Sequence, residues 1–296
     1  MSRGATTAVP RSLVWATDID VLPIDRVVER RDDHLVVRSP SNPTHYWGNL
    51  IVFDEPPRVG DRSRWERLFA AEFACQPASR HLTFCWDRTD GAAGAAAAEF
   101  AGSGYELERT VGLVAAPDAL HRHPRANQEV TVRALRPQAG NDEELWDGVV
   151  ELQVAARDSD RFAEEPHRIF CRRRLDDLRE LFCAARGAWY VALDGDEVVA
   201  SCGVVVTGQR GRFQAVDTAV GHRRRGICRR LVFEAGRDAA ATHGARRLVI
   251  AADPGYHALG IYESLGFAAA ERVCGVCRHP DADRAAAGPP AAGSSA

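Results

Sequence analysis

The chain has 296 residues, of which 45% are hydrophobic and 27% are charged, so it can form one large domain or two ordinary domains with packed cores. Its 38 basic residues are all arginine, because the sequence contains no lysine. This excludes pyridoxal-phosphate enzymes, P-loop NTPases and protein kinases, which each require an active-site lysine. A net charge of −3 gives no indication of nucleic-acid binding.

No segment approaches the roughly 18 apolar residues that a membrane span requires. The N-terminal sequence MSRGATTAVPRSLVW lacks the continuous apolar core of a secretory signal. Eight cysteines without such a signal are expected to be reduced thiols. We therefore expect a cytoplasmic protein that binds neither membrane nor nucleic acid, and the sequence does not indicate its oligomeric state.

The first half of the chain shows an apolar run over Tyr46 to Phe53, followed by a segment with acidic residues and two prolines, Asp54 to Arg64. A helical stretch around Arg67 to Phe69 and an apolar strand at His81 to Asp87 come next. The low-complexity segment Gly91 to Ala98 is expected to be a loop that leads into a short helix.

A connection between two halves is expected to begin at His121-Arg122-His123-Pro124-Arg125. Its paired histidines could bind a metal ion, but a solvated linker is the more common role for such a segment. We place this linker at residues 121–129.

The second half is expected to open with a strand over Val130 to Leu135 and a helix over Asp142 to Arg157, with acidic residues in its first turn. Apolar residues recur with a helical period between Pro166 and Ala185. Trp189 to Leu193 and Val198 to Val206 flank an Asp-Gly-Asp turn, which predicts a hairpin.

The next segment is the most informative about function. An apolar run from Phe213 to Val220 stops at Gly221, a cationic turn follows, and Gly226 leads into an amphipathic helix. A strand, a tight turn and a helix N-terminus aim several backbone N–H groups at one point, where the helix dipole adds positive charge. Gly226 is expected to let a phosphate approach the backbone. Taken alone, however, the turn could equally be a solvated arginine cluster on a surface helix.

Downstream, Leu248 to Ala252 reads as an apolar strand. It is followed by Asp253 to Phe267, which ends in Ile261-Tyr262-Glu263-Ser264-Leu265-Gly266-Phe267. The pair Cys274 and Cys277 invites a zinc interpretation, but a closed zinc site needs four ligands and no second pair at matching spacing is present. We expect a final strand with inward-facing thiols and no metal site.

These motifs resemble the GNAT superfamily of acetyl-CoA-dependent N-acetyltransferases. The family motif Gln/Arg-x-x-Gly-x-Gly/Ala matches Arg223 to Cys228 except at its last position, where Cys228 replaces the usual small residue. Arg224 stands where many members carry another glycine. Ile261 to Phe267 looks like the family's terminal (Leu/Ile)-Tyr-Glu-x-x-Gly-Phe. The resemblance covers residues from about 130 to 280.

The resemblance implies an α/β fold with a mixed, mostly antiparallel sheet flanked by helices. The second half has the GNAT order of strand, two helices, three antiparallel strands, helix, strand, helix and strand. A weaker version of this order recurs in the first half, which predicts a duplication. We assign residues 1–120 to a degenerate GNAT-like domain, 130–280 to an acetyl-CoA-binding domain and 281–296 to a disordered tail.

The family chemistry implies that a primary amine attacks the thioester of acetyl-CoA directly. The resemblance assigns the cofactor to Val216, Thr218, Ala219, Val220, Arg223, Arg224, Arg225, Gly226, Ile227 and Cys228. It makes Tyr262 the acid that protonates the leaving thiolate, although Tyr262 could instead pack in the core.

Several points stay open in the sequence. Asp217, His222 and Asp253 are each candidates for the general base, and each could equally be a cap or turn residue. The acceptor is an unidentified amine of a small molecule or peptide. A non-catalytic acyl-CoA sensor or scaffold is the alternative function. The acids and prolines at Asp54 to Arg64 predict that the first half has lost its phosphate site.

Overall fold

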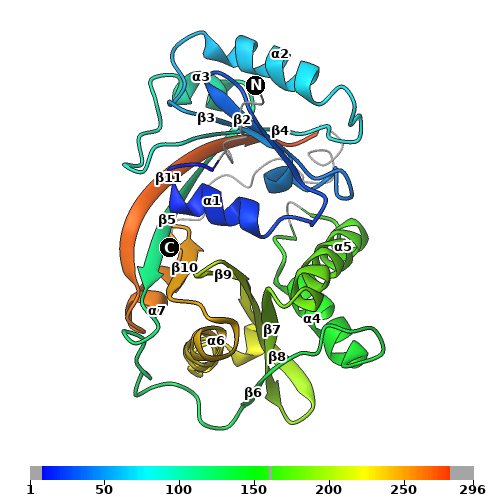
Figure 1. Cartoon of the computed structure of the whole chain (residues 1–296), viewed down its shortest axis with the longest axis vertical. Helices are drawn as coiled ribbons and strands as arrows, with labels where there is room; N and C mark the ends of the chain where they lie inside the picture. The colour runs from blue at the N-terminus through cyan, green and yellow to red at the C-terminus, as the bar shows by residue number, and fades with distance from the viewer. Residues whose placement is uncertain (1–8, 160–161, 281–296) are drawn as a thin grey trace, which may run out of the picture.

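The computed structural model describes residues 9–159 and 162–280, which form one mixed sheet flanked by helices (Figure 1). The tail predicted at residues 281–296 lies outside the described residues. The eleven strands lie in the order β1-β2-β3-β4-β11-β5-β10-β9-β8-β7-β6. Most neighbours are antiparallel, and the parallel pairs are β3 with β4 and β9 with β10. The predicted fold class is therefore confirmed.

The strands are β1 (Val27–Arg30), β2 (His34–Arg38), β3 (Leu50–Phe53), β4 (Leu82–Trp86), β5 (Glu106–Ala115), β6 (Thr131–Ala134), β7 (Gly187–Asp194), β8 (Glu197–Thr207), β9 (Arg210–Thr218), β10 (Arg247–Ala252) and β11 (Ala268–Arg278). The helices are α1 (Leu13–Asp20), α2 (Asp61–Glu72), α3 (Ala97–Gly102), α4 (Glu143–Ala156), α5 (Glu164–Cys183), α6 (Ile227–His243) and α7 (Ala258–Glu263), with 3₁₀ turns η1 (Tyr46–Gly48) and η2 (Val220–His222).

The two ends of the sheet repeat one pattern. In the first half β2 pairs antiparallel with β3, which pairs parallel with β4. In the second half β8 pairs antiparallel with β9, which pairs parallel with β10. A helix connects each parallel pair, α2 in one case and α6 in the other. This repetition supports the predicted duplication.

The last strand of each half pairs with a strand of the other half. β5, from the first half, pairs with β10 of the second, and β11, from the second half, pairs with β4 of the first. β5 and β11 also pair with each other in the middle of the sheet, where Figure 1 shows them curving side by side. The two halves therefore share one continuous sheet, which the sequence pattern did not predict.

The helices cover the sheet with amphipathic faces. On α6, Ile227, Leu231, Val232, Ala235 and Ala239 are buried with helical spacing and pack against β8 and β9. α4 and α5 pack on a separate hydrophobic cluster that includes residues of β7 and β8. α1, which the sequence did not predict, contacts β9, β10 and β11.

The predicted strand from Tyr46 to Phe53 is only half correct. Its first residues form η1, and the strand begins at Leu50. The side chain of Asn49 explains the break, because its amide donates to the carbonyl oxygens of Asn42 and His45 at 2.9 Å each. These hydrogen bonds fix a turn directly before the strand.

Candidate cofactor and active site

The two parallel strands of the second half separate. β9 and β10 pair only at their beginnings, where Arg210 to Arg212 lie beside Arg247 to Val249. From Phe213 to Thr218 the β10-facing edge of β9 has no partner strand among the described residues. Unpaired backbone groups along a strand edge can bind an extended ligand by strand-like hydrogen bonds. The separation places Val216 and Thr218 at such an edge.

A bulge lies within the same part of β9. The register against β8 shifts between Ser201 and Gly203, and Ala215 adopts a positive φ of 41°. A bulge re-aims the side chains that follow it and leaves backbone groups out of the ladder. Here it changes the direction of β9 just before Asp217.

The turn after β9 ends at the N-terminus of α6, as predicted. Ala219 follows the strand, Val220 lies in η2 with 66% of its surface exposed, and Gly226 is the N-cap of α6. Within the described residues, the N–H groups of Arg224 to Cys228 make no hydrogen bond to the protein. These amides and the dipole of a 17-residue helix make this terminus suited to an anion.

The structure gives Gly226 a role that the sequence did not indicate. Its φ is 78°, and a Cβ there would lie 2.0 Å from the carbonyl oxygen of Arg125. Asn127 fastens the same contact, because its N–H donates to the Gly226 oxygen at 3.1 Å. Gly226 is therefore needed for the close approach of the linker and for a left-handed conformation, and its expected contact with a phosphate stays a prediction.

The three arginines of the motif differ in their partners. Arg225 is held by carboxylates, at 3.2 Å from Asp194 and 3.0 Å from Glu129. The Nε of Arg223 donates to the carbonyl oxygen of Thr218 at 3.3 Å. Arg224 is exposed and adopts a φ of 60°, a conformation that favours glycine. Arg223 and Arg224 are thus the arginines of the turn without a carboxylate partner in the described chain.

Cys228 and Tyr262 lie near each other beneath this turn. Burial raises the pKa of the Cys228 thiol to about 12, so the residue that replaces the usual small residue is a neutral thiol. Tyr262 is 5% exposed and packs in the core of the second half. Burial raises the pKa of its hydroxyl, with smaller contributions from Cys228, Cys202 and Asp217. The hydroxyl is therefore protonated, and it lies near enough to Cys228 and Asp217 for their charges to affect its pKa.

The three candidate bases have different surroundings. Asp253 accepts a hydrogen bond from the N–H of Gly255 at 2.7 Å, and the Nδ1 of His222 lies 2.9 Å from Arg225. Both side chains therefore make contacts within their own turns. Burial raises the pKa of Asp217 to about 6, with the charge of Arg223 opposing that shift.

Asp217 faces α5. Burial raises the pKa of the Cys171 thiol on that helix to about 11, and the negative charge of Asp217 adds to the effect. A carboxylate with a pKa near neutrality is suited to accept a proton. Asp217 therefore combines a raised pKa with a position beside the open strand edge.

The described residues contain no group of three or more His, Cys, Asp or Glu side chains that could hold a metal ion. Cys274 and Cys277 are buried on β11, as the sequence predicts for inward-facing thiols. None of the described helices is long and apolar enough to cross a membrane.

Comparison of the sequence with family models and comparison of the structure with solved structures indicate the same fold. Residues 185–269 match the family model described as an acetyltransferase (GNAT) domain. No curated protein matches the sequence.

Solved structures share the fold over most of the chain. A functionally unknown conserved protein from Staphylococcus epidermidis aligns with a TM-score of 0.68 and 14% identity, over 87% of this chain and 95% of that one. A GCN5-related N-acetyltransferase from Kribbella flavida has a TM-score of 0.56 and 18% identity, over 86% and 89%. A tandem GNAT protein from the clavulanic acid biosynthesis pathway has a TM-score of 0.51 and 16% identity, over 88% and 86%.

The chain is thus an α/β protein with the GNAT fold, in which β9 leads through an arginine-containing turn into α6. Residues 185–269 of its second half match the GNAT acetyltransferase family model, and the resemblance noted in the sequence is confirmed. The domain boundaries and the individual site residues stay predictions.

Proposed function

We propose that the protein is an N-acetyltransferase that moves an acetyl group from acetyl-CoA to a primary amine. The separation of β9 from β10 beside the unpartnered amides of α6 is the observation that carries this proposal. In the proposal, pantetheine lies along the open edge of β9, at Val216, Thr218, Ala219 and Val220. The diphosphate lies at Arg223 to Cys228.

The reaction proceeds by direct attack. The amine nitrogen bonds to the thioester carbonyl carbon, backbone N–H groups near the bulge stabilise the oxyanion, and the C–S bond breaks as the tetrahedral intermediate collapses. Asp217 takes the proton that the amine loses. Tyr262 donates its proton to the departing thiolate, so that the products are an N-acetyl amide and coenzyme A.

The assignment of Asp217 as the base is supported by its surroundings. Its pKa of about 6 leaves it deprotonated at neutral pH, while its carboxylate stays more basic than an ordinary aspartate. Its position after the bulge places it next to the edge that would present the thioester.

One observation favours a second candidate, a non-catalytic acyl-CoA-binding protein. Tyr262 is almost fully buried and packs at 6.3 Å from the ring of Phe267, which is also the environment of a structural tyrosine. In that case the protein would bind the donor without transferring its acetyl group.

Two measurements test these functions. Calorimetric titration of the full-length protein with acetyl-CoA should show binding, and release of coenzyme A should accelerate with at least one amine in a panel of primary amines. Binding without release for any amine would favour the sensor. Absence of binding would contradict both functions.

A further inference from the structure

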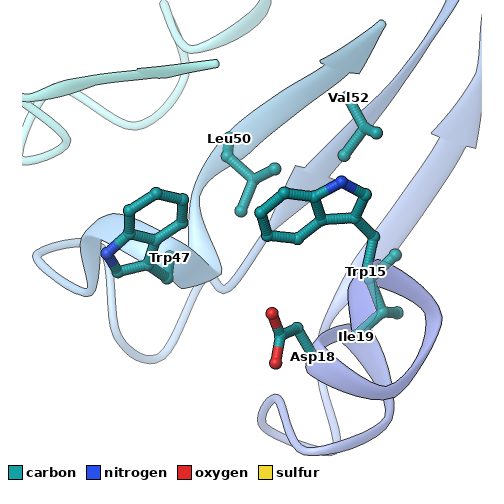
Figure 2. Close-up of a pocket in the computed structure, with 6 residues that line it drawn as sticks. All are labelled: Trp15, Asp18, Ile19, Trp47, Leu50 and Val52. Atoms are coloured by element: carbon teal, nitrogen blue, oxygen red, sulfur yellow. The ribbon is translucent and has the colours of Figure 1, made fainter. Parts of the chain in front are cut away.

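Two charged residues that the proposed transfer does not use lie where α1 of the first half and α5 of the second half come close to β9. Asp18 on α1 and Arg174 on α5 both keep some contact with solvent. Burial is nevertheless the main cause of the pKa shift of each group: it raises the pKa of the Asp18 carboxyl and lowers that of the Arg174 guanidinium. Asp18 lines a small pocket of the first half together with Trp15, Ile19, Trp47, Leu50 and Val52. Figure 2 shows the carboxylate of Asp18 turned toward the rings of Trp15 and Trp47.

Arg174 has neutral hydrogen-bond partners. One of its terminal nitrogens lies 3.1 Å from the Nε2 of His45, and the other donates to the Oε1 of Gln214 at 2.6 Å. His45 is neutral at pH 7, because burial lowers its pKa well below the usual value. Within the described residues, no carboxylate lies at ion-pair distance from Arg174. The nearby Asp177 instead accepts a hydrogen bond from Asn42 at 3.1 Å.

Arg212 on β9 lies beside Arg174 and is also incompletely satisfied. Its Nη2 pairs with Asp18 at 2.6 Å, and only 7% of its side chain is exposed. Its Nε and Nη1 are buried without a hydrogen-bond partner. Two neighbouring guanidinium groups thus share one ion-paired carboxylate. Buried charge of this kind is costly unless a ligand or another group compensates it.

The arginine pair lies on the same face of β9 as the proposed base. Gln214, which holds Arg174, precedes Asp217 by three residues, and Cys171, which faces Asp217, lies one turn of α5 from Arg174. One helical turn advances about 5 Å. An anionic group at Arg174 would therefore lie roughly 5–8 Å from an amine at Asp217, given that rise and the reach of the side chains.

We propose that the acceptor is an amine that carries a carboxylate several bonds away, such as an ω-amino acid or a short peptide. Its carboxylate binds Arg174, with Arg212 behind it, and its amine lies at Asp217. This assignment rests on the proposed acetyl transfer, whose acceptor it specifies. Carboxylate is well matched to a guanidinium because both are planar and can form paired hydrogen bonds.

Binding of matched probes tests the proposal without requiring turnover. In calorimetric titrations of the full-length protein, 6-aminohexanoate should bind at least about 10-fold more tightly than hexylamine, since charge-assisted hydrogen bonds distinguish the two. Arg174→Met should remove this preference by weakening 6-aminohexanoate about 10- to 100-fold, while hexylamine binding stays unchanged. Arg174→Lys should restore part of it.

One control variant and one further test variant complete the experiment. Arg173→Met changes an exposed arginine on the same helix and should leave both affinities unchanged. Asp18→Asn removes the competing carboxylate and should strengthen the binding of 6-aminohexanoate. Equal affinity of the normal protein for both probes would overturn the inference, as would an equal loss for both in Arg174→Met. Tighter binding of 6-aminohexyl phosphate than of 6-aminohexanoate would contradict the choice of carboxylate.

Failure of the proposed function gives a different result. If the protein does not bind acetyl-CoA but shows the carboxylate preference, the acetyl transfer is wrong and the anion site stands. If it binds acetyl-CoA and acetylates hexylamine and 6-aminohexanoate with equal KM, the transfer stands and the anion site is wrong.

Discussion

The turn that opens α2 in the first half and the turn that opens α6 in the second half have similar backbones and opposite chemistry. Each helix begins after a glycine in the left-handed region, Gly60 with φ 88° and Gly226 with φ 78°. In the first half, backbone N–H groups of the turn are already hydrogen-bonded to carboxylates. The N–H of Gly60 donates to Glu99 at 3.0 Å, and that of Arg58 donates to Asp61 at 2.9 Å. The turns therefore differ in that carboxylate side chains accept hydrogen bonds from the N–H groups in the first half, whereas those of Arg224 to Cys228 have no partner within the described residues.

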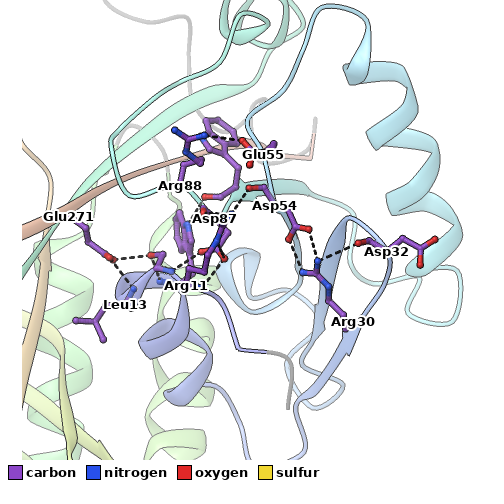
Figure 3. A network of polar contacts seen from close by, with 12 residues as sticks. Arg11, Leu13, Arg30, Asp32, Asp54, Glu55, Asp87, Arg88 and Glu271 are labelled. Carbon is purple, nitrogen blue, oxygen red and sulfur yellow. Dashed lines mark hydrogen bonds and ion pairs between the residues drawn. The ribbon is translucent and has the colours of Figure 1, made fainter. Parts of the chain in front are cut away.

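The acids of the first-half turn are themselves held by arginines. Asp54 pairs with Arg30, and Glu55 pairs with Arg88 at 3.0 Å (Figure 3). A cavity of about 270 Å³ lies at this turn, so space is available. Its lining includes four carboxylates, from Asp33, Asp54, Glu55 and Asp61. Like charges disfavour a phosphate there, which supports the predicted loss of the site.

The strands that precede the two turns also differ in how far they pair with the next parallel strand. β3 pairs with β4 from Ile51 up to its last residue, Phe53, and the N–H of Asp87 extends the contact at 2.7 Å. β9 leaves β10 after Arg212. Only the second half therefore offers an open strand edge beside its helix N-terminus.

The halves also differ at the proposed acid. After α3 the N–H of Tyr105 donates to the oxygen of Phe100, and after α7 the N–H of Phe267 donates to that of Tyr262. Gly104 and Gly266 precede these donors, both with positive φ. Phe100 thus occupies the place of Tyr262 and lacks its hydroxyl. The first half retains the backbone of the site without its reactive groups.

The largest expected effect concerns Asp217. Asp217→Asn should lower turnover by about 10²- to 10³-fold without changing acetyl-CoA affinity, because it removes the proton acceptor. In the normal protein kcat/KM should rise as the pH passes about 6, since the base must be deprotonated. Steady-state kinetics measure turnover and its pH dependence, and calorimetry measures the affinity for acetyl-CoA. An unchanged turnover would exclude Asp217 as the base.

Stability should change in the opposite direction in that variant. The pKa of Asp217 is raised from 3.8 to about 6, so its contribution to stability is present below pH 3.8 and is lost as the pH rises through 6. At pH 7 Asp217→Asn should therefore be more stable by about 1–3 kcal/mol, and at pH 3.5 the difference should vanish. Urea unfolding at the two pH values measures this; a less stable variant at pH 7 would contradict the burial of the charge.

The two helix-opening glycines should respond unequally to alanine. Gly226→Ala should lower the free energy of unfolding by about 3 kcal/mol or more, because the new Cβ meets the backbone of Arg125 in addition to the cost of its positive φ. Gly60→Ala has open space around its Cβ and should cost only about 1 kcal/mol. Urea unfolding of both variants compares them directly; equal losses would show that the linker contact does not constrain Gly226.

Some parts of the fold follow from the local sequence, and others depend on contacts between distant segments. Periodicity and turn residues were enough to predict α4, α5, the β7–β8 hairpin and the turn into α6, because each follows from local preferences. The exchange of β5 and β11 could not be predicted, since it depends on pairing between strands more than a hundred residues apart.

For the site, sequence motifs predicted the turn into α6 but did not reveal the contact between Gly226 and the linker. The contact with Arg125 arises from a linker that is remote in sequence. The proposed roles of Arg174 and Arg212 could not be predicted for a similar reason. They depend on contacts with His45 and Asp18, which belong to the first half.

Charge reversal in the second-half turn should give it the chemistry of the first. The double variant Arg223→Glu and Arg224→Glu should weaken acetyl-CoA binding about 10- to 100-fold, because carboxylates would repel the diphosphate or occupy its amide donors. Arg237→Glu, an exposed position further along α6, is the matched control and should bind normally. Calorimetry at constant ionic strength measures the three affinities; equal affinities would place the diphosphate elsewhere.

Tyr262→Phe gives the second half the residue found at the matching position of the first. Turnover should fall about 10-fold, with acetyl-CoA affinity nearly unchanged, because only the proton donor is lost. The ring stays in the core, so unfolding should change little. Kinetics with any accepted amine decide the point; full turnover would assign Tyr262 to packing.

The smallest effect is expected at Arg224, which adopts a left-handed conformation that glycine would occupy without strain. Relief of the strain in Arg224→Gly should stabilise the fold by about 1 kcal/mol, and the greater freedom of glycine in the unfolded chain should cancel roughly half of this gain. A net increase of about 0.5 kcal/mol in the free energy of unfolding is therefore expected. Arg223→Gly, at a φ of −65°, should instead destabilise the protein, because it brings the same entropy cost without relief of strain. Urea unfolding of the pair separates the two contributions, and destabilisation by both would show that the turn tolerates Arg224 without strain.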